Sequence, residues 1–583
     1  MITIDGSQLE GGGQLIRTAL SLSAILDIPM KIEHIREGRP KPGLAAQHLE
    51  GVRLVASISN GQLKNDSIGC TELQFTPGNS ELKSSYKADC GTAGAISLLL
   101  QVSLPLLLVK NNMNCNEIAG RSIPECSMKK LISCGTAVKY MGGTNVNFSP
   151  PIDHTIHVLL PLLSLMTSRS TSIKIDTIKR GYYPRGGGSV KLNINSNSNI
   201  NSGSSEKSEK MDISTKSFPS DQFFDSSKCT DNTSEREPCF SPFNLTKRGT
   251  ITSINATVFG NASNEVKMKL KDLLMSSLST SFLSLLIRSD SINSHSHSNP
   301  VGNDLKNNNF VMNVQLDEEQ DLKSVETSNN NGKIDTNKRN RNFMEHSTIK
   351  ESSTTKDKGQ KGRKNDMITT GIVLWAKTDT GCILSCNVMF QYKNVNVSDV
   401  GMDSGLQIPV LTPSISSSST RTRSTQSNIN KNEDKNENES NDINGIKNNN
   451  GNKHENKNND KNLLSYLNNT VDVILDEIIL LIKSNCCIDE HTADQLLIYM
   501  GLCEGVSRIL VAPIGEKSSL HIETVIEMLN ILSSVKYSIT EIDSEIDTDN
   551  CGNIDDNCDN SKIIDIGKCR LITCSGSKGW INP

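Results

Sequence analysis

The sequence is poor in aromatic residues and has no excess of positive charge. Phe, Trp and Tyr make up 4% of its 583 residues, and the formal net charge is -4. Proteins that coat nucleic acid without sequence preference need many Lys and Arg side chains to neutralise phosphates. The net charge therefore argues against that class, and any phosphate site must be a local cluster of basic residues.

Long apolar runs and a leader-like N-terminus are also missing. The longest apolar run, residues 96–109, is interrupted by Gln101 and by two serines and is too short to cross a bilayer. The chain opens with MITIDGSQ, which has neither the basic start nor the apolar stretch of a signal peptide. We therefore expect a soluble protein without membrane contact.

The 16 cysteines do not form a disulfide pattern. They are scattered along a long chain, whereas disulfide frameworks are typical of short secreted chains, and this favours a reducing compartment. Cys382 and Cys386 are close enough to bind a metal together. No second Cys or His pair follows at ligand spacing, so we assign no zinc.

Three stretches are rich in Asn, Ser, Lys and Asp and poor in aromatic residues: 196–242, 293–366 and 400–461. Such a composition buries too little apolar surface to offset the chain entropy lost on folding, so we predict disordered insertions. Roughly 400 residues remain, enough for one large domain and one smaller domain.

Between the insertions, short β-like runs alternate with longer helical patterns, which predicts an α/β (α+β) fold. Glycine-rich turns recur near the junctions and indicate repeated βα units. The predicted strands cover residues 1–4, 173–178, 190–194, 249–258, 370–388, 508–513 and 570–574. The predicted helices cover residues 14–26, 45–59, 94–109, 264–288, 470–484, 492–503 and 521–535.

A glycine-rich turn, residues 10–14, joins the first predicted strand to a helix that contains Arg17. Glycines at such a junction let backbone N–H groups approach a phosphate, and the helix N-terminus adds partial positive charge. The turn lacks the Lys-Ser/Thr of a P-loop and the spacing of a dinucleotide motif, and by itself it predicts only a tight turn. The carboxylate of Glu10 beside it suits a Mg²⁺ ligand.

A basic loop follows at residues 35–44. It holds Arg36, Arg39 and Lys41 and is stiffened by two prolines. Guanidinium groups in a rigid loop bind phosphate with less loss of entropy than on a flexible tail. A solvated basic loop would have the same composition. Gln47 follows on the next predicted helix, within reach of the same pocket.

The ten histidines include few candidates for a catalytic role. Four of them lie in the low-complexity stretches, where nothing fixes their geometry. A single histidine at the start of a helix is more often a cap or a surface residue than a catalyst. Spacing alone therefore leaves His491 and His521 open.

Several motifs, in order along the chain, resemble those of the RNA 3'-terminal phosphate cyclase family. The resemblance covers residues 1–194, 244–288, 370–390 and 467–574 and leaves the Asn-rich insertions unexplained. The motifs are residues 4–17, residues 35–44, Gln47-His48-Leu49, Thr92-Ala93-Gly94 with Gln101, Gly142-Gly143-Thr144 with Pro150-Pro151, the run RGYYPRGGG at 180–188, and Ala493-Asp494-Gln495-Leu496.

The resemblance implies a large domain of three repeated βα units, each packing a mixed sheet on helices, and a smaller inserted α/β domain. Residues 1–194 would form the first part of the large domain and residues 463–583 its last part. Residues 195–462 would form the inserted domain, with folded parts at 244–290 and 368–400 that the low-complexity insertions expand.

The resemblance also implies an activity. In that family the nucleophilic histidine is followed three residues later by Thr, which matches His521 and Thr524 here. The expected reaction uses ATP, with Mg²⁺ or Mn²⁺, to convert an RNA 3'-phosphate into a 2',3'-cyclic phosphate through histidine-bound AMP and an RNA adenylate. DNA lacks the 2'-hydroxyl that the reaction needs, so no preference for DNA is expected. The eukaryotic branch of the family implies a nuclear location, with the cytoplasm as a second compartment.

The roles of further residues follow from the same resemblance. Glu10 would help hold the metal. The substrate phosphates would be bound by Arg17, Arg36 and Arg39 and oriented by Gln47. The nucleotide site would be lined by Gln101, Pro150, His491, Asp494 and Gln495. His491 stands where the family has a Tyr that helps hold the adenine, and its smaller ring offers less stacking area.

Three other interpretations compete with this one. Non-catalytic cyclase-like proteins of ribosomal RNA processing share the fold but lack the nucleophile and the glycine-rich turn, and this chain has both. An enolpyruvyl-transferase-like enzyme would match only in its general plan of repeated units. An RNA scaffold built on the Asn-rich tracts would need a basic stripe and stacking aromatics, which those tracts do not offer.

Overall fold

The computed structural model of the protein describes residues 1–78, 80–119, 135–167, 171–196, 239–290, 310–317, 367–393, 451–533, 535–542 and 568–576. Most of the three predicted disordered insertions lies outside these residues. Two parts of them are regular structure, since β11 (Val311–Leu316) is a strand and α8 (Gly451–Lys483) is a helix. The prediction was wrong for β11 because so short an apolar alternation does not stand out within Asn-rich sequence, and wrong for residues 451–461 because they carry no apolar periodicity that would predict a helix.

Three four-stranded sheets share one βαβαββ plan, with the orders β1-β2-β4-β3, β5-β6-β8-β7 and β9-β14-β16-β15. When the strands of each unit are counted in chain order, the first pairs parallel with the second, and the second pairs antiparallel with the fourth. Parallel neighbours need a crossover and antiparallel neighbours need only a turn, so helices stand before the second and third strands. The α/β class with mixed sheets on helices is confirmed.

The elements of these three units are as follows. The first unit has β1 (Ile2–Asp5), α1 (Gly13–Leu26), β2 (Met30–Glu33), α2 (Ala46–Ser59), β3 (Gln62–Lys64) and β4 (Leu73–Thr76). The second unit has β5 (Ser85–Asp89), α3 (Ile96–Ala119), β6 (Thr136–Gly142), α5 (Ile152–His154), the π-helix η1 (Thr155–Leu159), α6 (Leu160–Ser164), β7 (Thr171–Lys179) and β8 (Gly188–Ser196). The third unit has β9 (Asn244–Leu245), α9 (Glu490–Leu502), β14 (Gly505–Val511), α10 (Glu516–Leu532), β15 (Lys536–Ile542) and β16 (Cys569–Gly576).

A fourth sheet interrupts the third unit between β9 and α9. This inserted unit has the strand order β11-β10-β12-β13 and two helices, and its remaining elements are β10 (Ile251–Gly260), α7 (Asn264–Asp290), β12 (Met367–Thr378) and β13 (Ile383–Lys393). Helix α8 packs on β13 and therefore crosses the expected boundary at residues 462 and 463. Strand β9, expected in the insert, pairs with β14 of the third unit.

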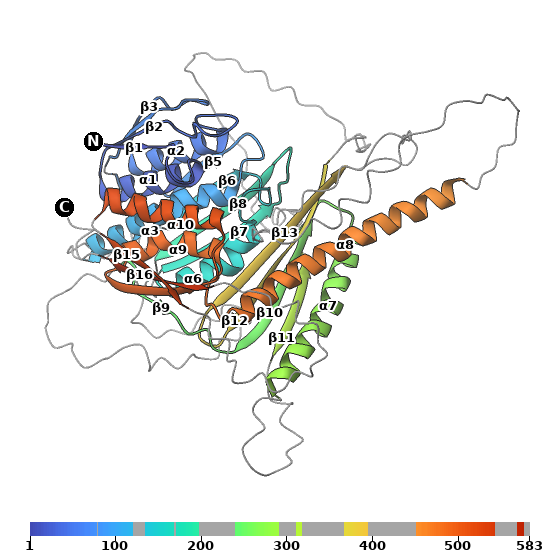
Figure 1. Ribbon diagram of the computed structural model, residues 1–583. Coiled ribbons are helices and arrows are strands. Elements are labelled where there is room, and N and C mark those ends of the chain that lie inside the picture. Colours follow the sequence, from blue (N-terminus) through green and yellow to red (C-terminus); the bar gives the residue numbers. More distant parts are fainter. Residues whose placement is uncertain are drawn as a thin grey trace, which may run out of the picture.

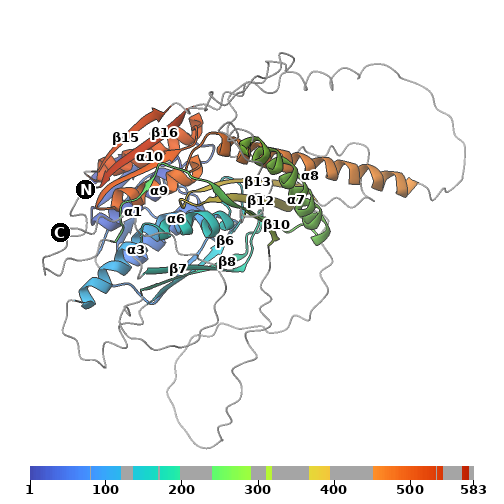
Figure 2. The ribbon, with the colours of Figure 1, turned by 90° about the horizontal axis from the view of Figure 1, so that it is seen from below.

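The helices of the three repeated units lie on the inside of the molecule, between their sheets. In Figure 2 α9, α10 and α6 lie between the sheet of β15 and β16 and the sheet of β7 and β8. One apolar core joins the three units, and a second core fills the inserted unit. Figure 1 shows the inserted unit beside the repeated units, with α8 projecting away from them. Across the described ranges, the structure has no helix long and apolar enough to cross a membrane.

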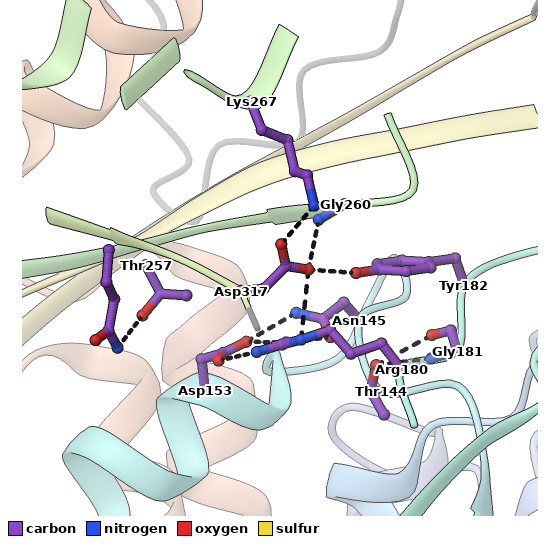
Figure 3. A network of polar contacts seen from close by, with 11 residues as sticks. Thr144, Asn145, Asp153, Arg180, Gly181, Tyr182, Thr257, Gly260, Lys267 and Asp317 are labelled. Atoms are coloured by element: carbon purple, nitrogen blue, oxygen red, sulfur yellow. Dashed lines mark hydrogen bonds and ion pairs between the residues drawn. The ribbon is translucent and has the colours of Figure 1, made fainter. Parts of the chain in front are cut away.

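A buried polar network, which we call the Arg180 network, holds the inserted unit against the second unit (Figure 3). Arg180 donates two hydrogen bonds of 2.7 Å to Asp153, and its Nε lies 3.4 Å from Asp317. Asp317, just after β11, also accepts from Lys267 at 2.9 Å and from the Tyr182 hydroxyl at 3.0 Å. Two carboxylates and two cations thus balance inside this contact.

Candidate active site

A cavity lies where the first helices of the three repeated units meet. Its empty volume is about 480 Å³, part of which opens to solvent. Each helix contributes residues three or four positions apart, a spacing that places them on one face. The lining comprises Gln14, Arg17 and Thr18 of α1, Ser97, Leu100, Gln101 and Leu104 of α3, Asp494, Gln495, Ile498 and Tyr499 of α9, and Thr155, Leu159 and Val525. The repeats therefore form one joint site that no single unit has.

His521 lies one turn before Val525 on α10, close enough to Arg17 to feel its charge. Its Nδ1 atom is buried and has no hydrogen-bond partner among the described residues. Burial, followed by the positive charge of Arg17, lowers the pKa of His521 to about 4. At neutral pH the ring is therefore uncharged, and one of its nitrogens carries a lone pair that can attack an electrophile.

Glu10 connects the glycine-rich turn to the basic loop and to α10. Arg39 donates to the Glu10 carbonyl oxygen at 2.9 Å and also bonds its carboxylate. The Glu10 N–H donates to the Thr524 hydroxyl at 3.4 Å. Burial raises the pKa of Glu10, and the charges of Arg39 and Arg17 oppose that rise. These contacts bring the predicted phosphate-binding loop close to the helix of His521.

Arg17, near the start of α1, is partly buried and bonds Gln14 on the same helix. A Cβ atom at Gly13 would lie 2.8 Å from Arg17 Nη1 and 2.6 Å from His48 Nε2, so only glycine leaves room for both side chains. Burial lowers the pKa of Arg17 to about 10, against the attraction of Glu10 and Asp494. The guanidinium stays charged at neutral pH, and its buried Nε has no hydrogen-bond partner in the described structure.

Arg36 and Gln47 make contacts that support the backbone around the cavity. Arg36 Nη1 donates to the Gly43 carbonyl oxygen at 2.8 Å and so braces the basic loop. Gln47 Oε1 accepts the Ala95 N–H at 3.1 Å and ties α2 to the start of α3. Both side chains thus lie near the cavity. Their contacts hold the main chain in position and do not show a phosphate contact.

The residues expected around the nucleotide divide into two groups. Gln101, Asp494 and Gln495 line the cavity, and Gln101 Oε1 is buried without a hydrogen-bond partner in the described stretches. Burial raises the pKa of Asp494 to about 7, against the attraction of His491 and Arg17. His491 and Pro150 are not among the lining residues. The His491 carbonyl oxygen accepts from Gln495 Nε2 at 2.8 Å, and Pro150 lies in the loop between β6 and α5.

Glu10 is the expected metal ligand. One of its carboxylate oxygens pairs with Arg39, and the other, Oε2, is buried and has no hydrogen-bond partner among the described residues. In the same described part of the chain, no three His, Cys, Asp or Glu side chains cluster as a metal site. Mg²⁺ is often held by one or two carboxylates together with substrate phosphates, and the free oxygen of Glu10 fits that arrangement.

Sequence reasoning gave no role to two residues that lie next to Arg17. His48 was named only within the Gln47-His48-Leu49 motif, but it is buried against Gly13, and burial lowers its pKa to about 3, so it is neutral. Gln14 was only part of a motif, but it lines the cavity and bonds Arg17. The first turn of a helix after a glycine-rich strand end was the available signal for Gln14, and the Gln47-His48-Leu49 motif was the available signal for His48.

The fold and the cavity define an α/β protein of repeated units that places an uncharged histidine among Arg side chains, which suits transfer of a phosphate-bearing group. Comparison with protein families matches residues 8–539 to the family described as RNA 3'-terminal phosphate cyclase. The chain belongs to that family.

Named relatives match the chain over about a third of its length. An RNA 3'-terminal phosphate cyclase of Caldivirga maquilingensis is 44% identical over 194 residues, which is 33% of this chain and 48% of that protein. Proteins of the same name are 39% identical in Archaeoglobus fulgidus, over 33% of this chain and 51% of the relative, and 40% identical in Nostoc punctiforme, over 33% and 50%. The chain thus spans about half the length of the curated relatives it matches.

Proposed function

We propose that the protein is an ATP-dependent RNA 3'-terminal phosphate cyclase in which His521 is the nucleophile. The observation that carries the proposal is the buried Nδ1 of His521, which has no hydrogen-bond partner among the described residues and lies within the electrostatic reach of Arg17. The cavity between α1, α3 and α9 would receive the nucleotide, because it combines apolar walls with a few polar groups.

In the first step a ring nitrogen of His521 attacks the α-phosphorus of ATP. The N–P bond forms while the bond to the pyrophosphate oxygen breaks, so pyrophosphate leaves and AMP stays on the ring. Arg17 and Arg39 face this centre with positive charge and offset the negative charge that develops on the phosphoryl oxygens. A divalent cation between Glu10 and the phosphates would supply further neutralisation.

In the second step an oxygen of the RNA 3'-phosphate attacks the bound AMP and releases His521. The neighbouring 2'-hydroxyl then attacks the terminal phosphorus, loses its proton and expels AMP, which closes the 2',3'-cyclic phosphate. Ring closure is intramolecular and therefore fast once the phosphate is activated. The requirement for a 2'-hydroxyl restricts the substrate to RNA.

The test is transfer of label from ATP that carries a labelled α-phosphate. A labelled protein bond that is labile in acid and stable in alkali is expected for the natural protein, and His521→Ala should abolish it. His491→Ala is the matched control and should only weaken labelling, because His491 is expected to contact the adenine and not to attack phosphorus; neither histidine is among the residues that line the cavity. The reverse ranking would show that the nucleophile is misassigned, and absence of label in the natural protein would favour the non-catalytic cyclase-like alternative.

A further inference from the structure

Two aromatic side chains are exposed on neighbouring loops of the second unit. Phe148 is 91% exposed and Tyr183 is 53% exposed, and no other aromatic residue in the described ranges is classed as exposed. Phe148 lies between β6 and α5, and Tyr183 lies between β7 and β8. Asn145 N–H donates to the Gly181 carbonyl oxygen at 3.3 Å, so the two loops are hydrogen-bonded together. The two exposed rings therefore stand on loops that are joined through their backbones.

The backbone at Phe148 is strained without any gain from packing. Its φ of 62° is in the left-handed region, which bulky residues rarely adopt. A core aromatic residue can offset such strain by burying its ring, but this ring stays in solvent. Strain that the surrounding structure maintains is a feature of binding sites, where it holds a side chain ready for a ligand.

Both loops are attached to the walls of the candidate active site. The Phe148 loop leads directly into α5 and then to Thr155, which lines the cavity. The Tyr183 loop packs on residues just before α3, since a Cβ at Gly186 would lie 2.5 Å from the Thr92 carbonyl oxygen. Gln47, beside the phosphate-binding cluster, bonds the same segment through Ala95.

We propose that Phe148 and Tyr183 form a stacking platform for bases of single-stranded RNA near its 3' end. The inference rests on the proposed function and specifies how the RNA strand is held next to the reacting phosphate. Unpaired bases are recognised by stacking on aromatic rings, beside cations that follow the backbone. Lys179 and Arg185, both exposed, flank Tyr183 and supply positive charge complementary to that backbone. A purely apolar protein partner would not need them.

The test is the affinity of the full chain for a fluorescent single-stranded oligoribonucleotide with a 3'-phosphate, measured by anisotropy. Phe148→Gly removes the ring and also relieves the backbone strain, so its melting temperature should not fall. We expect about tenfold weaker binding for Phe148→Gly and for Tyr183→Ala, and nearly natural affinity for Phe148→Trp, which keeps a stacking face. The salt dependence of binding should keep its slope, because no charge is removed. Leu464→Ala, at an apolar position 46% exposed on α8, is the matched control.

The outcomes separate this inference from the proposed function. Equal affinities of Phe148→Gly, Tyr183→Ala and Leu464→Ala would overturn the platform, even in a protein that accepts label from ATP. A natural protein that takes no label but binds RNA through the two rings would overturn the proposed function alone. Stacking would also be contradicted if Phe148→Trp bound the RNA as weakly as Phe148→Gly does.

Discussion

The charges of the Arg180 network balance one another and those of the cluster around Arg17 do not, although Arg180 Nε, like Arg17 Nε, is buried without a hydrogen-bond partner among the described residues. In the Arg180 network each carboxylate meets a cation, and Asp153 shows the effect on its pKa. Burial by itself raises the pKa of Asp153, and the charge and hydrogen bonds of Arg180 more than reverse the rise. The network thus satisfies its own charges and needs no ligand.

The Arg17 cluster lacks this balance. Arg17, Arg36 and Arg39 gather around one glutamate, and burial raises the pKa of the neighbouring Asp494 to about 7 and so weakens its countercharge. Glu10 Oε2, Arg17 Nε, Gln101 Oε1 and His521 Nδ1 are buried and have no hydrogen-bond partners among the described residues. Buried polar groups are normally paired, so this excess identifies a site prepared for an anionic, hydrogen-bonding ligand.

Breaking the paired network should have the largest effect on stability. Arg180→Met leaves the carboxylates of Asp153 and Asp317 buried with less countercharge, and we expect a loss of about 3–5 kcal/mol in the free energy of unfolding. Urea unfolding at neutral pH measures it. Arg39→Met, which removes an Arg whose side chain is 42% exposed, is the control and should cost less than about 1 kcal/mol. Equal losses would end the distinction between the two clusters.

A second prediction concerns Asp494 and pH. Its pKa, raised to about 7, lies above the unfolded value, so its favourable contribution is present below about pH 4 and is lost as the pH rises through 7. Asp494→Asn should therefore be more stable than the natural protein by roughly 2 kcal/mol at about pH 8, with a smaller difference at about pH 5. Unfolding curves at both pH values measure this. A difference independent of pH would mean that Asp494 titrates normally.

Two glutamines test the same difference between paired and unpaired polar groups, with a smaller expected effect. Gln101 Oε1 is unpaired among the described residues, whereas Gln47 Oε1 accepts a backbone N–H. Gln101→Met should raise the free energy of unfolding by about 1 kcal/mol, and Gln47→Met should lower it by about the same amount. Thermal unfolding of the two variants without ligand gives both values. Destabilisation by Gln101→Met would show that its amide is satisfied in solution.

The smallest expected effect is the pH dependence of His521 labelling. Because burial lowers the pKa of His521 to about 4, the ring stays neutral above about pH 5, and the labelling rate should change by less than about twofold between pH 5.5 and 8. The rate should fall as the pH approaches 4. The Asp494→Asn background removes the titration of the nearby cavity carboxyl group. A fall centred near pH 6.5 would indicate a solvated ring.

Sequence patterns predicted the helices α1 and α2 closely and missed several strands, including β6 and β15 with seven residues each. The apolar periodicity of α1 and α2 placed these helices to within one residue at either end. Strands β2, β3 and β4, with four, three and four residues, were not predicted, because so short a run carries too little alternation to be distinguished from loop. The pairing of β9 with β14 was also missed, since the inserted unit separates the two strands in sequence.

The candidate site was predicted in its parts and not in its arrangement. The glycine-rich turn and the basic loop were recognisable because the residues that characterise each of them are close together in the sequence. Glu10 of the turn and Arg39 of the loop do meet. The roles of Pro150 and His491 at the nucleotide stay predictions, since neither of them, nor His521, is among the residues that line the cavity. Whether a side chain reaches a cavity depends on how three helices cross, which local patterns do not encode.

The sequence by itself determined the repeated βα units, the glycine-rich turn and the set of residue types from which a phosphate site can be made. Only the tertiary structure decided which of them meet, bringing Arg17, Gln101 and Asp494 from three units to one cavity. The same packing lowers the pKa of His521 and leaves its Nδ1 unpaired among the described residues. The reason is that burial and Coulomb attraction depend on neighbours in space, and these neighbours lie hundreds of residues apart in the chain.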